Sequence, residues 1–398
     1  MTILVYDLLL LVMLFVLYRC GKAFTKTGKV LSVAGFIAII AYALNEGLRF
    51  GRGVDFNDYW QKYELLARGV DSTQNIAFLL FEKLMIELGL SWQCCIFVMS
   101  IMFIIGTFFL LKCYKEIAAA TLPIFCLFSL YPVENMVRWY LAFSVFMIGL
   151  PFLLIDCRKS YVRYFFFSLF ACLFHYAFIP IPILFLIISF LKKPIIHPFI
   201  IIPLYFSIGL LFQTESMLVF VDYVNLIGDM SEKFQSYGGN AEYWLTEGYS
   251  GRSTTAFSNM NELSLCFIVL VLGHKLVRGA EKKYIFAYNI FVIGFLIRPI
   301  ANQIELVMRY DDVCFVFGSI IVAIIINELF VHRKVLVAPI IYFVTIIVFI
   351  NYGRTYFTTP FKNNPQKYLY VWDSKGISAE KMLDMWSNES YKASKKND

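Results

Sequence analysis

Long apolar segments follow one another along almost the entire chain. They occupy residues 3–18, 30–48, 93–111, 117–132, 137–155, 162–178, 178–191, 195–212, 260–274, 284–300, 310–331 and 335–351. A helix of about 20 apolar residues is long enough to cross the hydrocarbon core of a bilayer. The pattern therefore predicts an all-α polytopic integral membrane protein with about 12 transmembrane helices.

A further segment, residues 76–90, has a different pattern. Its apolar positions are interrupted by Glu82, Lys83 and Glu87. Such a segment is too short and too charged to cross the bilayer easily, and it suits an amphipathic helix in the membrane interface. We therefore predict a short helix here that does not cross.

The charges between the apolar runs indicate the orientation. Lys and Arg predominate in the loops around residues 19–29, 112–115, 158–163, 192–193, 275–283 and 333–334, whereas the long loop 213–259 holds more acidic than basic residues. The basic face of a membrane protein is cytoplasmic. Both termini and the loops 49–75 and 213–259 then lie outside, and a crossing by 76–90 would destroy this asymmetry. The sequence predicts a multi-span membrane domain over 1–351 and a polar tail over 352–398.

Composition excludes several other classes of protein. The chain has 398 residues, of which 60% are hydrophobic and only 16% charged. A soluble protein of this size needs roughly 25% charged residues. The net charge of +7 is spread over short loops, so we predict no nucleic-acid partner. The nine cysteines lie in or beside apolar runs without metal-ligand spacing, and we expect neither a metal nor a cofactor.

Ionisable residues near an outer membrane face are the strongest candidates for function, because placing them at membrane depth costs at least about 2.5 kcal/mol. The first group lies in the loop 48–64 and includes Arg49, Arg52, Asp55, Tyr59 and Tyr63. The density of aromatic and charged side chains favours a binding role over an ordinary solvated loop.

Three further groups follow at the predicted outer side. Glu134 and Arg138 are spaced i, i+4 and share a helix face, which also fits a structural ion pair. His175 stands beside an outer helix end, where a proton-transfer role competes with that of a core histidine. Arg298 and Arg309 lie between two apolar runs, where a tight polar turn is the simpler explanation. Arginine recurs in these elements, and its planar guanidinium grips phosphate with two hydrogen bonds. We therefore expect a diphosphate site.

At these residues the sequence resembles the EpsG family, the Wzy-type polymerases of bacterial exopolysaccharide, capsule and O-antigen. The resemblance rests on five short motifs in family order: RGVDFNDY (52–59), FLLFEKL (78–84), VRWYLA (137–142), FHYAF (174–178) and MRY (308–310). The chain departs from the family pattern at Trp139, where a glutamine is usual.

The resemblance implies a GT-C-like membrane glycosyltransferase in the bacterial inner membrane, with its active site facing outward. Its substrate would be an oligosaccharide repeat unit on undecaprenyl diphosphate, and its partners the bilayer, a flippase and a chain-length regulator of the same pathway. Diphosphate ligands would be Arg49, Arg52, Arg138 and Arg309. Asp55 or His175 would be the catalytic base, and Tyr59, Tyr63, Glu82, Glu134 and Arg298 would bind sugar or support the site.

Three other functions remain open at this point. A flippase for lipid-linked oligosaccharide would also use basic residues and many spans, but should place its cations in a central cavity. A non-catalytic assembly partner would tolerate loss of the outer arginines. A ligase that attaches finished glycan to another acceptor cannot be separated from a polymerase by sequence.

Overall fold

The chain forms two compact units in a computed structural model that describes residues 2–53, 55–70, 74–154, 160–212, 256–302, 305–331, 339–357 and 369–373. Unit 1 comprises Met1–Leu186 and Gly353–Asp398, and unit 2 comprises Ile187–Tyr352. We describe each unit by itself.

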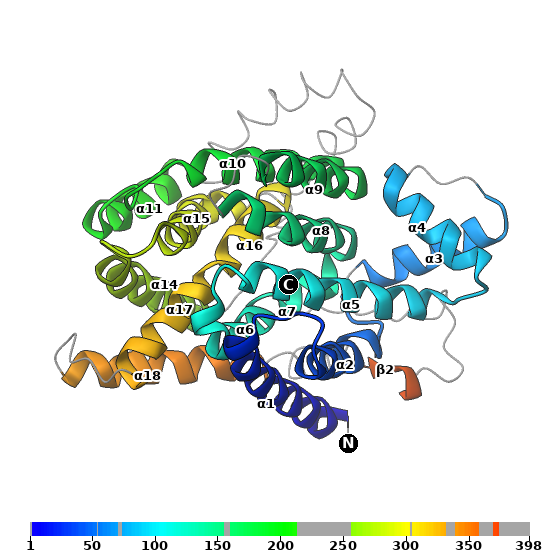
Figure 1. Ribbon diagram of the computed structural model, residues 1–398, viewed down its shortest axis with the longest axis horizontal. Coiled ribbons are helices and arrows are strands. Elements are labelled where there is room, and N and C mark those ends of the chain that lie inside the picture. The colour runs from blue at the N-terminus through cyan, green and yellow to red at the C-terminus, as the bar shows by residue number, and fades with distance from the viewer. Residues whose placement is uncertain are drawn as a thin grey trace, which may run out of the picture. The chain divides into compact units, whose positions relative to one another are not determined.

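Unit 1 is built from helices and one very short sheet (Figure 1). Its helices are α1 (Thr2–Thr27), α2 (Val33–Gly47), α3 (Phe56–Ala67), α4 (Ile76–Glu87), α5 (Trp92–Leu111), α6 (Ala118–Phe128), α7 (Leu130–Asn135), α8 (Val137–Leu154) and α9 (Ser160–Phe174), with the 3-10 turns Lys115–Ile117, Tyr176–Phe178 and Val371–Asp373. Strands β1 (Arg49–Phe50) and β2 (Leu369–Tyr370) pair antiparallel. Helix α10 (Pro180–Ser189) leads from unit 1 into unit 2.

In its described residues, unit 2 contains helices and connecting turns but no strand. It contains α11 (Pro198–Leu211), α14 (Ala256–Val277), α15 (Lys282–Ala301), α16 (Glu305–Val316), α17 (Gly318–Ile326), a π-helical turn (Asn327–Val331) and α18 (Pro339–Arg354). Helices α15 and α16 approach closely, because a Cβ atom on Gly294 would lie 2.7 Å from Cβ of Cys314. The rings of Tyr205 and Phe295 stack at 4.4 Å and join α11 to α15.

Every apolar run of the sequence contains a helix. Within the part of the chain that the structure describes, six helical stretches are long and apolar enough to cross a membrane: Leu4–Thr27, Trp92–Leu111, Val137–Leu154, Met260–Val277, Lys282–Ala301 and Val307–Leu329. Shorter apolar helices cover Val33–Gly47, Ser160–Phe174, Tyr176–Ser189, Pro198–Leu211 and Phe343–Arg354. The prediction of an all-α membrane protein is confirmed, while the count of 12 crossings and the GT-C-like architecture remain predictions.

The predicted amphipathic helix is present as α4. Its 12 residues span about 18 Å, well short of the roughly 30 Å hydrocarbon core. Leu80 and Leu84 are exposed on one face, whereas Phe78, Glu82 and Met85 are buried on the other. Helix α4 packs beside α3 and against α9, as Figure 1 shows for the α3–α4 pair.

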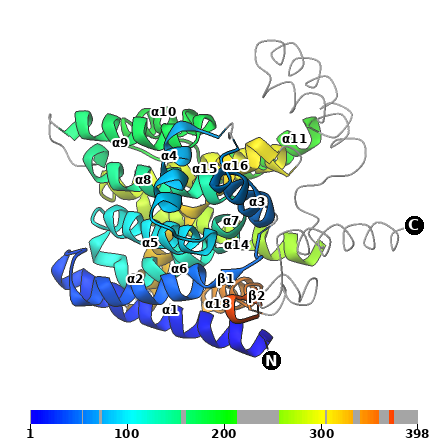
Figure 2. The same cartoon turned by 90° about the vertical axis from the view of Figure 1, so that its right-hand side faces the viewer.

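The central packing of unit 1 joins α1 to α2 and α6, α2 to α5, and α5 to α8, which in turn packs on α9 (Figure 2). Gly106 allows the close approach of α5 and α8, because a Cβ atom there would lie 2.5 Å from the carbonyl oxygen of Ser144. These contacts hold the beginning of α8 in a fixed position relative to the loop that follows α2.

Two side-chain hydrogen bonds and one strand pairing bring distant segments of unit 1 together at one end of its helices. The Tyr6 hydroxyl lies 3.3 Å from the carbonyl oxygen of Tyr356, and the Tyr131 hydroxyl lies 3.3 Å from that of Thr355. The β1–β2 pairing brings residues 369–370 to the same level as Arg49. The start of α1, the loop after α2 and the segments 353–357 and 369–373 therefore share one side. Helix α1 has 26 residues and is about 39 Å long, so Lys26 lies near the opposite face.

We predict that single cysteines at positions 68 and 372, in a background without native cysteines, react with a membrane-impermeant maleimide added from outside. A cysteine at position 26 should stay unlabelled until the membrane is permeabilised. Both Arg68 and Trp372 are exposed. A cysteine there that fails to react would therefore lie on the inner side of the membrane rather than in the protein interior. Joint labelling of positions 26 and 372 from one side would contradict this topology.

Candidate functional site

A buried ion pair organises the loop that follows α2. The Arg52 guanidinium is 1% exposed and lies 2.9 Å from Oε1 of Glu134 at the end of α7. The same guanidinium donates to the carbonyl oxygen of Asn45 at 2.9 Å. Burial alone would lower the pKa of Arg52, but the negative charges of Glu134 and Glu46 raise it above its ordinary value. Arg52 is therefore permanently charged, and its charge is balanced within the protein.

Gly53 makes this arrangement possible. Its φ of +94° lies in the left-handed region, and a Cβ atom at this position would collide with the carbonyl oxygen of Glu134. Only glycine lets the loop pass this close to α7. The short distance between Arg52 and Glu134 therefore requires glycine at position 53.

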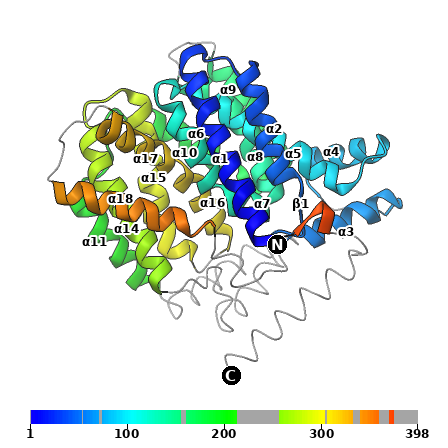
Figure 3. The ribbon, with the colours of Figure 1, turned by 90° about the horizontal axis from the view of Figure 1, so that it is seen from below.

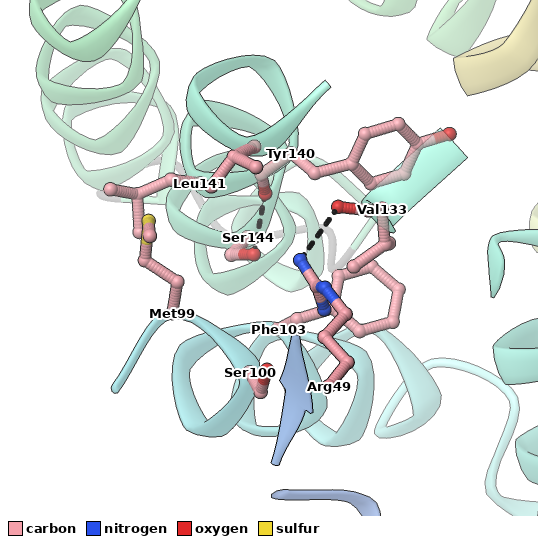
Figure 4. Close-up of a pocket in the computed structure, with 9 residues that line it drawn as sticks. Arg49, Met99, Ser100, Phe103, Val133, Tyr140, Leu141 and Ser144 are labelled. Atoms are coloured by element: carbon pink, nitrogen blue, oxygen red, sulfur yellow. Dashed lines mark hydrogen bonds between the residues drawn. The ribbon is translucent and has the colours of Figure 1, made fainter. Parts of the chain in front are cut away.

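Arg49 is buried in a second ion pair. Its guanidinium lies 3.3 Å from Oε2 of Glu46 and donates to the carbonyl oxygen of Val133 at 3.4 Å. Figure 4 shows the Arg49 side chain beside a small cavity between α5 and α8, which Ser100 and Ser144 also line. The cavity offers about 10 Å³, enough for one water molecule and far too little for a sugar or a diphosphate.

Arg138, by contrast, is half-buried and faces aromatic rings. Its Nε donates to the Tyr59 hydroxyl at 2.8 Å, and its guanidinium carbon lies 5.0 Å from the centre of the Tyr59 ring and 5.8 Å from that of Phe78. No carboxylate forms an ion pair with Arg138 within the described residues. We call Tyr59, Gln74, Phe78, Glu82 and Arg138 the Arg138 cluster.

Glu82 is the acidic residue of this cluster. The side chain is fully buried on α4, and neither carboxylate oxygen has a well-formed hydrogen bond among the described residues. Burial raises the pKa of Glu82 to about 7, although the nearby Gln74 amide and the positive charges of Arg138 and Lys62 act in the opposite direction. A carboxyl group with such a pKa can take up or release a proton near neutral pH.

The two predicted bases, His175 and Asp55, lie on elements next to those of the Arg138 cluster. The His175 ring meets the ring of Trp139, the residue after Arg138, edge to face at 5.1 Å. The Asn75 amide donates to the carbonyl oxygen of Phe174 at 3.0 Å, which ties the start of α4 to the end of α9. Asp55 is half-buried at the start of α3 and makes no side-chain cap bond there.

Tyr59 and Tyr63, expected to bind sugar, are both buried. Tyr59 stacks on Trp92 at 6.0 Å and holds Arg138. The Tyr63 hydroxyl donates to the carbonyl oxygen of Leu90 at 2.6 Å, which joins α3 to the turn between α4 and α5. In this structure both rings support the packing around Arg138 and Glu82.

The remaining predicted residues belong to unit 2. Arg298 on α15 forms ion pairs with Glu262 and with Asp311, the latter at 3.7 Å, and lies 4.1 Å from the centre of the Phe315 ring. Arg309 is half-buried on α16. The predicted outer loop 213–259 lies largely outside the described residues, which resume at Ala256.

A family model decides the relationship of the chain to known proteins. The model of the EpsG family matches residues 32–370. The chain belongs to the EpsG family. The matched region includes the Arg138 cluster and ends at β2. At the level of the family, membership supports a membrane enzyme of the polysaccharide-polymerase type. No curated protein and no solved structure matches the chain.

Sequence reasoning missed several partners of the arginines, among them Glu46 and Tyr370. Glu46 lies inside an apolar run, and an acid in that setting is itself a signal of a buried ion pair. Tyr370 stands in the polar tail, and its ring lies 5.1 Å from the Arg52 guanidinium. No local sequence pattern connects Tyr370 with Arg52, because the two residues are far apart in the sequence and meet only when β2 pairs with β1.

We predict that Gly53→Ala destabilises the protein more than Gly69→Ala. Both residues have left-handed φ angles, a strain that costs about 1–3 kcal/mol for other residues. An added Cβ atom at Gly69 meets nothing within 4 Å, whereas at Gly53 it collides with α7. The thermal unfolding midpoint in detergent measures the difference. Equal shifts for the two variants would show that the Gly53–Glu134 contact is not tight.

Proposed function

We propose that this EpsG-family protein polymerises oligosaccharide repeat units carried on undecaprenyl diphosphate, at the outer face of the bacterial inner membrane. The observation that carries the proposal is the Arg138 cluster. A half-buried guanidinium that forms no ion pair with any described residue lies beside a buried carboxyl with a pKa of about 7. The lipid-linked substrate is what the family resemblance implies.

Arg138 would bind the diphosphate of the donor. Its Nε is fixed by Tyr59, so the planar guanidinium is oriented before substrate arrives. Arg138 also lies in the first turn of α8, where the helix N-terminus carries partial positive charge. Negative charge grows on the leaving diphosphate as the bond breaks, and a positioned arginine stabilises this charge.

Glu82 would act as the general base. The hydroxyl oxygen of the acceptor sugar bonds to the anomeric carbon of the donor sugar, while the bond from that carbon to the diphosphate oxygen breaks. The diphosphate leaves with the electron pair, and the hydroxyl proton passes to the Glu82 carboxylate. This assignment differs from the predicted bases Asp55 and His175, and it rests on the burial of Glu82 and on its place in the Arg138 cluster.

The profile of lipid-linked glycans tests the reaction class. Cells with the protein should produce a ladder of repeat units, and cells without it should accumulate single units on the lipid. A ladder that persists without the protein would contradict polymerase activity. A ladder that persists on the lipid while only the transfer of finished glycan fails would indicate the ligase instead.

We predict that Glu82→Gln abolishes chain growth, because an amide cannot accept the hydroxyl proton. The control is Glu87→Gln, an exposed residue of the same helix, which should leave the ladder unchanged. In the wild-type protein the base is the ionised form, so the rate of polymerisation should fall as the pH drops through about 7. A rate that rises as the pH falls through this range would exclude Glu82 as the base.

We predict that Arg138→Lys is nearly as damaging as Arg138→Ala, because lysine lacks the planar fork that grips phosphate and also holds Tyr59. The matched controls are Arg68→Lys and Arg68→Ala at an exposed position of unit 1. Glycan chain length measures the effect. Near-normal chains in Arg138→Lys would show that Arg138 contributes only charge.

A further inference from the structure

We propose that residues 369–373, which we call the strap, hold Arg138 in position for catalysis, and that Tyr370 is the positioning residue. The inference rests on the proposed function of the Arg138 cluster. It assigns a role to the polar tail, which carries no catalytic motif of its own.

The strap is joined to the loop after α2 by backbone hydrogen bonds. Arg49 pairs with Tyr370, and Phe50 with the residue before it, in the antiparallel β1–β2 ladder. The Val371 amide donates to the carbonyl oxygen of Leu48 at 3.0 Å. Figure 3 shows β2 beside β1, near the start of α1 and near α3. A sheet of two-residue strands is too short to be stable alone, so side chains must hold it in place.

Tyr370 provides that side-chain contact. It is fully buried, and its ring lies 5.1 Å from the Arg52 guanidinium carbon. Tyr6 of α1 contacts the same guanidinium at 5.5 Å. Two aromatic rings therefore shield Arg52 from solvent, and such desolvated cation–π contacts are the strong ones. Trp372 stacks on Tyr370 at 4.6 Å and is itself half exposed, which covers the outer side of the strap.

The effect of the strap reaches Arg138 through Glu134. Arg52 is paired with Glu134, Gly53 lies too close to the Glu134 carbonyl to accept a Cβ atom, and α7 ends one residue later. Helix α8 begins at Val137, so Arg138 follows Glu134 by four residues. Without Tyr370, water reaches Arg52 and weakens its pairing with Glu134. The start of α8, and with it the Arg138 guanidinium, then loses its fixed position relative to Tyr59.

The experiment compares Tyr370→Ala with Tyr370→Phe in the full-length protein, with Tyr18→Ala as the matched control at an exposed tyrosine of α1. A second pair of variants ends the chain after residue 373 or after residue 368. For each, we measure polymer in cells, the amount of protein in the membrane and its thermal midpoint in detergent. Tyr370→Ala and the chain ending at 368 should yield at least about tenfold less polymer. Tyr370→Phe, Tyr18→Ala and the chain ending at 373 should stay near wild type.

Rescue by phenylalanine at normal protein levels identifies a positioning role for the ring, which phenylalanine keeps beside Arg52. Full activity in Tyr370→Ala or in the chain ending at 368 overturns the proposal. Loss of folded protein in both also overturns it, since the strap would then serve folding alone. If the wild-type protein itself does not polymerise, the proposed function fails. If it polymerises and Tyr370→Ala does too, only the strap proposal fails.

Discussion

The buried pair between Arg52 and Glu134 is the interaction on which the candidate site depends. Two charges removed from water this completely stabilise a structure only when each is well satisfied, and loss of one partner typically costs about 3–5 kcal/mol. Here the pair joins the loop after α2 to the short helix that precedes α8. Arg49 and Glu46 add a second ion pair beside it. The two pairs set the position at which α8 begins.

This arrangement separates the three arginines of unit 1 that were predicted to bind diphosphate into two groups. Arg49 and Arg52 are almost inaccessible and are balanced by glutamates, so they hold the framework. Arg138 is half-buried. It contacts the ring and the hydroxyl of Tyr59, and it has no counter-ion among the described residues. A guanidinium of this kind attracts an anion from outside the protein, which is what a diphosphate leaving group offers. Glu134 and Glu82 are both buried, but Glu134 is paired with Arg52, whereas Glu82 forms no ion pair among the described residues.

The sequence predicted the helices well and the site only in part. Apolar runs locate each helix because a span must be apolar along its whole length, and α4 was separable because Glu82, Lys83 and Glu87 interrupt it. Glu134 and Arg138 were predicted to share one helix face, but Glu134 lies on α7 and Arg138 on α8. Glu134 forms its ion pair with Arg52 instead. The contact between Arg138 and Tyr59 was not predicted, because it joins residues 79 positions apart in the chain. The β1–β2 pairing has no periodic pattern at all, since each strand has only two residues.

The central claim is that Glu82 and Arg138 act on one reaction, in which each new glycosidic bond releases one lipid diphosphate. The most direct measurement uses the purified protein in liposomes with a defined undecaprenyl-diphosphate-linked repeat unit, and follows released lipid diphosphate and glycan length together at pH values on both sides of 7. The account predicts equal amounts of bonds formed and diphosphate released, at a rate that falls on the acid side. Polymer formation without diphosphate release, or the same rate at every pH in this range, would contradict it.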